Sequence, residues 1–340
     1  MNLNRLAMGT FLRAMAVGAG NPISARAYLE GQRDAPAQAT AIASIKMLGA
    51  SGTGDFAGAG VGGGVASGYL TQVRDRSVFL GLAMQKFPFN QRIFVSAIGA
   101  TAEEVDEGKA IPFSQGEYLE QYLRGRLFAA MVAQSKELVV SGDMGALLAI
   151  LDDSAGAVAE ALDRAALSPD AAASVFAGQT EITATGTSGA QLDADLKALC
   201  DATPTAYRDG VFVMAQKTAT FLASVRTDGS RNFPDVGPAG GALLGLPVKI
   251  AGALTRPGSP PTGAIGIVSA SQIMHAVDDV VELAVSTQAT VEMSAAPTGD
   301  SAAGTQGIQN LVPLYQANAA AIRGSIRADW FARPGAAAFV

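Results

Sequence analysis

A glycine-rich stretch over residues 51–68 is the feature that most constrains how this chain of 340 residues can fold. From residue 56 on it holds six glycines, at Gly58, Gly60, Gly62, Gly63, Gly64 and Gly68. Ordering glycine in such density costs much backbone entropy, so the stretch is flexible unless neighbours hold it. A dinucleotide-binding loop needs a strand before its glycines, and Ser51–Asp55 has no strand pattern. We therefore interpret residues 51–68 as a flexible connector.

The segments on the two sides of this connector differ in pattern. Residues 1–50 are rich in alanine and lack a long regular period, which predicts a mostly extended or partly helical arm. Beyond the connector, Phe87–Ile98 has the aromatic and β-branched residues of a strand, and Ile111–Phe128 returns as a second extended segment. The charged segment Thr101–Lys109 lies between them. Together these segments predict a long two-stranded excursion, that is, a pair of strands that projects from the body of the protein.

The clearest helix is predicted at residues 143–166. Asp143 can cap its first turn, apolar residues follow at helical spacing, and Ser168-Pro169 should stop it. The remaining chain alternates between short elements. We expect helices at 191–200 and 216–225, and strands at 181–185, 211–214, 245–251, 265–268, 280–285, 289–293 and 320–330.

Composition excludes several classes of protein. Only 16% of the residues are charged and the net charge is −6, so the chain has no dense positive field for gripping nucleic acid. With 49% hydrophobic residues it is not a disordered acidic chain either. Low charge and small side chains suit a protein that buries much of its surface against other chains. The uncharged runs at 56–73, 257–277 and 301–322 lack the leucine-rich density of a membrane-spanning helix.

No constellation for catalysis, cofactor binding or metal binding emerges from the sequence. His275, Asp278 and Asp279 would share a helix face, but the β-branched residues that follow predict a strand, in which these side chains do not converge. The single cysteine, Cys200, cannot form an internal disulfide and is expected to be a small core residue. We therefore expect no catalytic residue, no cofactor and no metal ion.

The densest charged cluster is acidic, and two interpretations of it stay open. It is either a solvated loop tip or a contact with a basic patch of a neighbouring chain. Its members are Glu103, Glu104, Asp106 and Glu107.

Several segments together resemble one family, the major capsid proteins of tailed bacteriophages with the Hong Kong 97-type fold. Val105–Asp143 is similar to a segment of the family that has an acidic residue and a glycine, followed by a Pro-Ser-like sequence. A β-strand segment comes next and ends in a Ser-x-Glu-Leu-like sequence before the spine helix. Tyr207–Ala251 looks like the family's apical domain, with Leu-Gly-Leu-Pro-Val at residues 244–248. The segment from Gln316, with Arg-Ala-Asp-Trp at 327–330, looks like its closing strand. Gly62–Leu82 resembles the stretch after its N-terminal arm, so the resemblance covers residues 60–340.

The resemblance implies an α+β subunit with four parts. They are an N-terminal arm and connector at 1–83, an extended loop at 84–125, a peripheral domain at 126–203 plus 306–340 with a spine helix at 143–166, and an apical domain at 204–305. The arm would hinge at Gly62, Gly63 and Gly64. Lys109 would stand where the family places its cross-linking lysine, without an evident Asn partner, and the acidic cluster would contact a neighbouring subunit.

The implied function is self-assembly into hexamers and pentamers of an icosahedral phage head around double-stranded DNA, in the cytoplasm of a host bacterium. Expected partners are further copies of the chain, a portal protein, and possible separate scaffold and decoration proteins. DNA would be held without sequence-specific contacts, and no membrane would be involved. The alternatives are an encapsulin-like shell and a small-oligomer enzyme. Trp330, the only tryptophan, is expected to be a core anchor, with a wedge between subunits as the alternative.

Overall fold

The computed structural model divides the chain into two compact units. Unit 1 comprises residues 1–76, 127–159 and 278–326, and unit 2 comprises residues 77–126, 160–277 and 327–340. Each unit therefore draws on three separate segments of the chain. The structure describes residues 3–18, 21–31, 63–98, 104–105, 113, 117–141, 144–227, 230–256, 262–278, 282–292 and 311–340.

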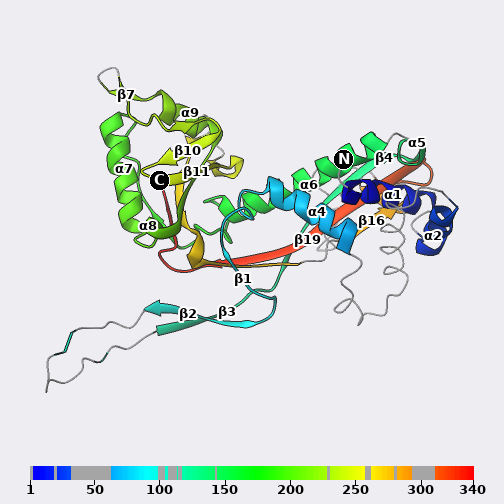
Figure 1. Ribbon diagram of the computed structural model, residues 1–340, viewed down its shortest axis with the longest axis horizontal. Helices are drawn as coiled ribbons and strands as arrows, with labels where there is room; N and C mark the ends of the chain where they lie inside the picture. Colours follow the sequence, from blue (N-terminus) through cyan, green and yellow to red (C-terminus); the bar gives the residue numbers. More distant parts are fainter. Residues whose placement is uncertain are drawn as a thin grey trace. The chain divides into compact units, whose positions relative to one another are not determined.

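Helices dominate the described part of unit 1 (Figure 1). They are α1 (Leu3–Val17), α2 (Pro22–Glu30), α4 (Gly63–Arg76), α5 (Lys136–Ser141) and the first part of α6 (Met144–Leu167). The strands are β4 (Arg126–Ser135), β16 (Glu282–Ser286), β17 (Thr290–Glu292), β18 (Leu311–Pro313) and the first part of β19 (Ala319–Ala332). In this unit β19 pairs antiparallel with β16, from Ala321 to Ser325.

Two helices lie within the segment that the sequence predicts to be a mostly extended or partly helical arm. They are α1 and α2, and α1 packs against α4, α5 and β16. The buried side chains of α1 include Ala7, Phe11, Ala14 and Met15, at the spacing of one helix face. Alanine favours helix intrinsically, and these side chains gain further stability from tertiary packing that no local period announces.

A close approach of three elements holds the centre of unit 1. Tyr69 of α4 is fully buried, and its Oη lies 2.8 Å from Oγ of Ser154 in α6. Gly324 of β19 faces the same ring, where any Cβ would collide with the Tyr69 hydroxyl. Glycine at this position therefore allows α4, α6 and β19 to pack around one tyrosine.

The predicted long helix is present as α6. Its buried residues follow the helical period through Leu147, Leu151, Val158 and Leu162, and Ala166 completes the row. The helix ends at Leu167, immediately before Ser168-Pro169, as the restriction on the residue before proline predicts. Asp143, the expected cap, lies outside the described residues.

Unit 2 is built on a seven-stranded mixed sheet in the order β5-β20-β14-β6-β11-β10-β9 (Figure 1). The bounds are β5 (Thr180–Glu181), β20 (Ala337–Phe339), β14 (Ile265–Ser269), β6 (Gly210–Met214), β11 (Leu246–Ile250), β10 (Gly240–Leu243) and β9 (Val236–Gly237). Its helices are the end of α6, α7 (Gly189–Ala202), α8 (Ala206–Asp209) and α9 (Gln216–Ser224). The other strands are β1 (Gln85–Lys86), β2 (Arg92–Ile98), β3 (Glu117–Tyr122), β7 (Arg226–Thr227), β8 (Ser230–Arg231), β12 (Thr255–Arg256), β13 (Thr262–Gly263), β15 (Ile273–Val277) and the end of β19.

The two faces of this sheet are covered differently. On one face, leucines of α7 and α9 pack on Phe212 of β6 and Ile267 of β14 in a single apolar cluster. On the other face, the Phe176 ring lies against Gly266, where a Cβ would collide with it, and stacks edge-on against Phe339 with ring centroids 5.6 Å apart. The predicted helices at 191–200 and 216–225 and the strands at 211–214, 245–251 and 265–268 are thus confirmed.

A buried carboxylate shapes the turn that follows α4. Asp163 of α6 accepts hydrogen bonds from Ser77 Oγ at 2.5 Å and from the backbone amides of Val78 and Phe79 at 2.8 and 3.1 Å. Burial raises the pKa of Asp163, and the three donors act in the opposite direction. This turn at residues 77–79 positions the fully buried ring of Phe79.

Trp330 of β19 is buried within a single chain, with 6% of its surface exposed. Its indole N–H donates to the Ala173 carbonyl at 2.8 Å. Phe79 contacts it edge-on with centroids 5.0 Å apart, and the Arg126 guanidinium lies 3.9 Å from the ring centroid. The ring therefore joins the turn at 77–80, β19 and the segment before β4.

Replacing Asp163 should destabilise the subunit. In Asp163→Ala the hydroxyl and two amides lose their acceptor, and each buried unsatisfied group costs about 1–3 kcal/mol, so we expect a loss of at least about 3 kcal/mol in free energy of unfolding. Urea unfolding of unassembled subunits, followed by circular dichroism, measures this. Asp153→Ala, an exposed change on the same helix, is the control. Equal midpoints for the two variants would contradict the role given to Asp163.

Replacing Trp330 tests the core-anchor prediction against the wedge alternative. Trp330→Ala should cost about 3–5 kcal/mol and make the subunit insoluble. Trp330→Phe keeps a ring against Phe79 and Arg126 but loses the hydrogen bond and part of the buried volume, so it should cost less, at about 1–3 kcal/mol. Soluble Trp330→Ala capsomers with an unchanged far-ultraviolet circular dichroism spectrum would instead favour the wedge.

Candidate functional site

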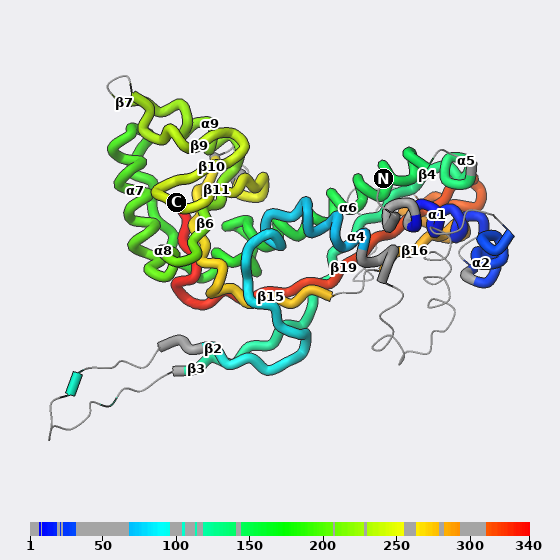
Figure 2. Tube along the Cα trace, viewed as in Figure 1, coloured from blue at the N-terminus to red at the C-terminus, as the bar shows by residue number. Residues whose placement is uncertain are grey.

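The predicted excursion contains an antiparallel hairpin of β2 and β3, whose strands lie side by side in Figure 2. The register pairs Arg92 with Tyr122, Phe94 with Glu120 and Val95 with Leu119. Successive side chains of a strand point to opposite faces, so one face carries the even-numbered residues Arg92, Phe94 and their partners. The hairpin therefore has two chemically different faces.

The inner face fixes the hairpin to its own unit. Ile93 and Val95 of β2 are buried together with Leu123 against Met274 and Ala276 of β15. Phe87, Phe89 and Phe331 pack around this cluster and are partly buried. The base of the hairpin is thus part of the core of unit 2.

A single carboxylate ties the segment after β3 to the closing strand. Asp329 of β19 accepts a hydrogen bond from the backbone amide of Arg124 at 2.8 Å and forms an ion pair with Arg126 at 2.9 Å. Between these arginines, Gly125 adopts a φ of +73°, which most side chains avoid, and a Cβ there would press on the Phe89 ring. Asp329 therefore fixes where the chain leaves the hairpin and enters β4.

The outer face exposes aromatic rings. Phe94, Tyr118 and Tyr122 have 61%, 68% and 46% of their surface exposed. The Arg92 guanidinium lies 5.1 Å from the centroid of the Phe94 ring. Arg92 also donates to Glu120, which accepts a second hydrogen bond from the Tyr122 hydroxyl at 2.6 Å. Exposed aromatics gathered on one strand face are typical of a protein-binding surface.

The charges on this outer face are internally balanced. The hydrogen bond from Arg92 and then that from Tyr122 lower the pKa of Glu120. The same bond to Glu120 raises the pKa of Tyr122. A lowered pKa favours the ionised carboxylate and a raised pKa favours the neutral phenol, so both hydrogen bonds to Glu120 are maintained near pH 7.

Of the predicted acidic cluster, the structure describes Glu104, which is exposed. Glu103, Asp106, Glu107 and Lys109 lie outside the described residues. Contact of the cluster with a neighbouring subunit stays a prediction.

The predicted arm hinge is described only in part. Gly63 and Gly64 form the start of α4, and Gly62 lies outside the described residues. The hinge also stays a prediction.

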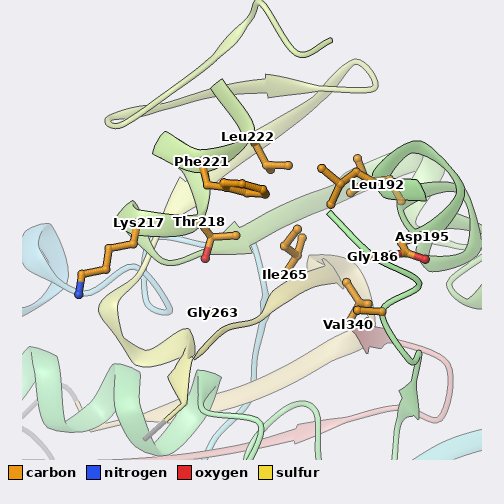
Figure 3. Close-up of a pocket in the computed structure, with 12 residues that line it drawn as sticks. Gly186, Leu192, Asp195, Lys217, Thr218, Phe221, Leu222, Gly263, Ile265 and Val340 are labelled. Atoms are coloured by element: carbon orange, nitrogen blue, oxygen red, sulfur yellow. The ribbon is translucent and has the colours of Figure 1, made fainter. Parts of the chain in front are cut away.

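Unit 2 has one further hollow, a cavity of about 280 Å³ between α7, α9 and β14 (Figure 3). Leu192, Leu196, Phe221 and Ile265 give it an apolar lining, and Lys217 is its lining cation. The carboxylate of Asp195 is already bound by the amide and hydroxyl of Thr185, at 3.0 and 2.8 Å. The apolar lining with one cation at its edge suits the binding of an apolar group.

The residues considered for metal chemistry do not converge in the described structure. His275 lies in strand β15, as the sequence predicts, with Nδ1 3.1 Å from the Gln85 carbonyl. Cys200 is half-buried beside the apolar cluster of unit 2, and burial, followed by the charge of Asp201, raises its pKa. The described residues contain no group of three potential metal ligands and no helix long and apolar enough to cross a membrane.

Sequence reasoning did not identify Asp329 or the outer hairpin face. In the sequence, Asp329 stands within the Arg-Ala-Asp-Trp segment at 327–330, and no local pattern indicates a role for it. The alternation from Arg92 to Val95 does carry the signal of a strand with one apolar and one exposed face. Which of the two faces remains exposed to solvent depends on β15, because β15 covers the other face of β2. This contact joins residues far apart in the sequence.

Comparison with known proteins identifies the family. The model of the phage capsid family matches residues 64–298, more than half of the chain. The capsid polyprotein of Pseudomonas phage PAJU2 is 27% identical over 266 residues, and the chain spans only 39% of that relative's length, against 75% of its own.

Solved structures show the same fold at low sequence identity. Those from Gordonia phage Cozz, Mycobacterium phage Adephagia and Mycobacterium phage Cain have TM-scores of 0.54, 0.53 and 0.52 at 17%, 18% and 18% identity. Each match covers 78% of this chain and 85–89% of the other. The fold is thus the mixed α+β fold of Hong Kong 97-like phage capsid structures. The chain belongs to the phage capsid family of Hong Kong 97-type major capsid proteins, a family of structural proteins of the virion.

Proposed function

We propose that this chain assembles into hexamers and pentamers of an icosahedral tailed-phage head that encloses double-stranded DNA. The observation that carries the proposal is the hairpin of β2 and β3. Its inner face is bound into its own unit, while its outer face exposes Phe94, Tyr118 and Tyr122. A shell subunit needs such a surface, because identical copies must meet on every edge.

The charge of the chain supports the same role. Charged residues are only 16% of the total, which limits repulsion between many identical copies. The net charge of −6 suits an inner wall past which DNA slides, because a positive wall would bind phosphates and release counterions.

We assign the parts of the subunit as the family resemblance implies. The arm and connector would be residues 1–83, the extended loop 84–125, the peripheral domain 126–203 plus 306–340 with its spine helix, and the apical domain 204–305. These four parts do not coincide with units 1 and 2 of the structure, because each unit gathers residues that pack together within one chain. Partners would be other copies, a portal protein, and possible separate scaffold and decoration proteins.

Electron microscopy of the purified protein tests this proposal. Icosahedral particles eluting at megadalton size support it, and a small oligomer contradicts it. An encapsulin-like shell, which holds enzymes, would give particles whose native contents include protein cargo and no genome. Nucleic acid inside native particles therefore separates the two kinds of shell.

The acidic cluster should make assembly sensitive to charge. If Glu103 and Glu104 contact a basic patch of a neighbour, Glu103→Gln/Glu104→Gln should lower assembly yield at low salt and flatten its decline at rising salt. Exposed ion pairs contribute only about 0–1 kcal/mol each, but every copy repeats them. Light scattering over a salt series measures the effect. Identical salt curves for the variant and the wild type would mean that the tip is only solvated.

The hinge prediction concerns shell closure rather than folding. Replacing Gly62, Gly63 and Gly64 together by alanine should cost about 1 kcal/mol or more at any position that needs positive φ in some lattice environment. The variant should fold normally and form open or aberrant shells in negative-stain images. Gly58→Ala/Gly60→Ala is the matched control in the same glycine-rich stretch. Normal closed particles from the triple variant would contradict the hinge.

A further inference from the structure

One block of this acidic chain carries an excess of positive charge. Residues 204–277 have six Lys or Arg against three Asp or Glu, although the whole chain has a net charge of −6. Such asymmetry between segments indicates a surface that meets a negative partner. The block belongs to unit 2 and includes the short hairpin of β7 and β8.

One face of this hairpin is held against the start of α7 (Figure 1). Any Cβ on Gly189, the first residue of α7, would collide with the hydroxyl of Thr227 and the side-chain amide nitrogen of Asn232. The backbone amide of Asn232 also donates to the Val225 carbonyl at 3.1 Å, so the pairing extends beyond the two short strands. The backbone of the hairpin is therefore fixed by contacts within unit 2.

The opposite face of the hairpin displays two exposed arginines. Arg226 of β7 pairs across the strands with Arg231 of β8. Successive side chains of a strand point to opposite faces, so both arginines point away from the face that contacts Gly189. Asn232 and Val225 form a hydrogen-bonded pair, and such pairs alternate with non-hydrogen-bonded ones. The arginines therefore form a non-hydrogen-bonded pair, in which opposed Cβ atoms are closest, at about 4.5–5.5 Å.

This arrangement has a cost that no described side chain offsets. Like charges at directly opposed positions destabilise a hairpin. Among the residues that the structure describes, no carboxylate forms an ion pair with Arg226 or Arg231, whereas Arg92, Arg126 and Arg323 each have one. A bound anion would remove the repulsion between the two guanidinium groups. The hairpin thus holds two cations together in a form that an anionic ligand would stabilise.

The spacing of the two arginines suits the phosphates of a nucleic acid. A guanidinium group is planar and binds phosphate through two parallel hydrogen bonds. Each strand of duplex DNA presents a phosphate about every 3.4 Å along the helix axis, so two guanidinium groups this close together can hold neighbouring phosphates of one strand. A lone carboxylate carries one charge and would leave the second guanidinium uncompensated. Phosphate contacts also carry no sequence information, which a shell around an arbitrary genome requires.

We propose that Arg226 and Arg231 form a clamp that binds the sugar–phosphate backbone of the enclosed double-stranded DNA without reading its sequence. The clamp rests on the proposed function, because only a head that encloses DNA brings the two together. Two phosphate contacts per subunit bind weakly and release few counterions, so the acidic remainder of the chain still lets DNA slide. The clamp also explains why a weakly charged chain retains two opposed arginines.

Binding of a fluorescently labelled DNA duplex to unassembled subunits tests the clamp by anisotropy over a salt series. Arg226→Gln/Arg231→Gln should weaken binding about tenfold at low salt and lower the slope of log affinity against log salt by about 2, because two phosphate contacts are lost. Lys197→Gln/Lys249→Gln removes two exposed cations elsewhere in unit 2 and should change neither quantity. Equal losses in the two variants would overturn the clamp, and so would a strong preference of the wild type for one of two unrelated duplex sequences.

Arginine labelling of assembled particles separates the clamp from the proposed function. Phenylglyoxal should modify Arg226 and Arg231 several-fold more slowly in particles that contain DNA than in particles that lack it, because a bound phosphate blocks each guanidinium group. Arg208, an exposed arginine of the same unit, should react equally in both. Equal labelling of the pair would overturn the clamp while the shell function stands, and a wild type without particles would overturn both. If the glutamine variant binds DNA like the wild type but forms fewer particles, the arginines contact another copy instead and the clamp is wrong.

Discussion

The carboxylate of Asp329 is the contact on which the geometry of unit 2 around the hairpin depends. It accepts the Arg124 amide and pairs with Arg126, whose guanidinium then lies over the Trp330 ring. Phe79 contacts the Trp330 ring edge-on, because Asp163 holds the turn at 77–79. Hydrogen bonds to charged groups are about twice as strong as neutral ones, so Asp329 fixes the chain where it leaves the hairpin, and Asp163 fixes the turn at 77–79. Without Asp329, the β2–β3 hairpin would have an apolar inner face but no defined exit into β4.

This anchoring gives the exposed face of the hairpin its value as a binding surface. A ribbon of two strands is marginal by itself in water, so its outer aromatics can be presented only if the inner face is held by something else. Ile93 and Val95 supply the apolar part of that hold, and Asp329 supplies the polar part. Preorganised side chains lose little entropy when they bind, which suits a contact that is repeated at every edge of a shell.

Sequence reasoning succeeded where a local rule operates and failed where the decisive contact is distant. Periodicity and proline placed α6, and alternating apolar segments placed α7, β6, α9 and β14 within a few residues. The N-terminal segment was expected to be mostly extended or partly helical, and no local rule placed α1, whose Phe11 face packs on α4, α5 and β16. Those partners lie from about 50 to more than 260 residues away in sequence, so no window around α1 contains them.

The sequence alone determined the class of the protein: few charges, no catalytic constellation, and an order of segments that resembles a phage capsid subunit. It also determined the acidic cluster, the lone tryptophan and the glycine-rich connector as chemical facts. Only the tertiary structure decided which hairpin face is open, that Asp329 holds the segment after β3, and that Arg226 opposes Arg231. The physical reason is that periodicity and turn chemistry are local, whereas burial, strand register and ion pairing depend on residues that the fold brings together from distant parts of the chain.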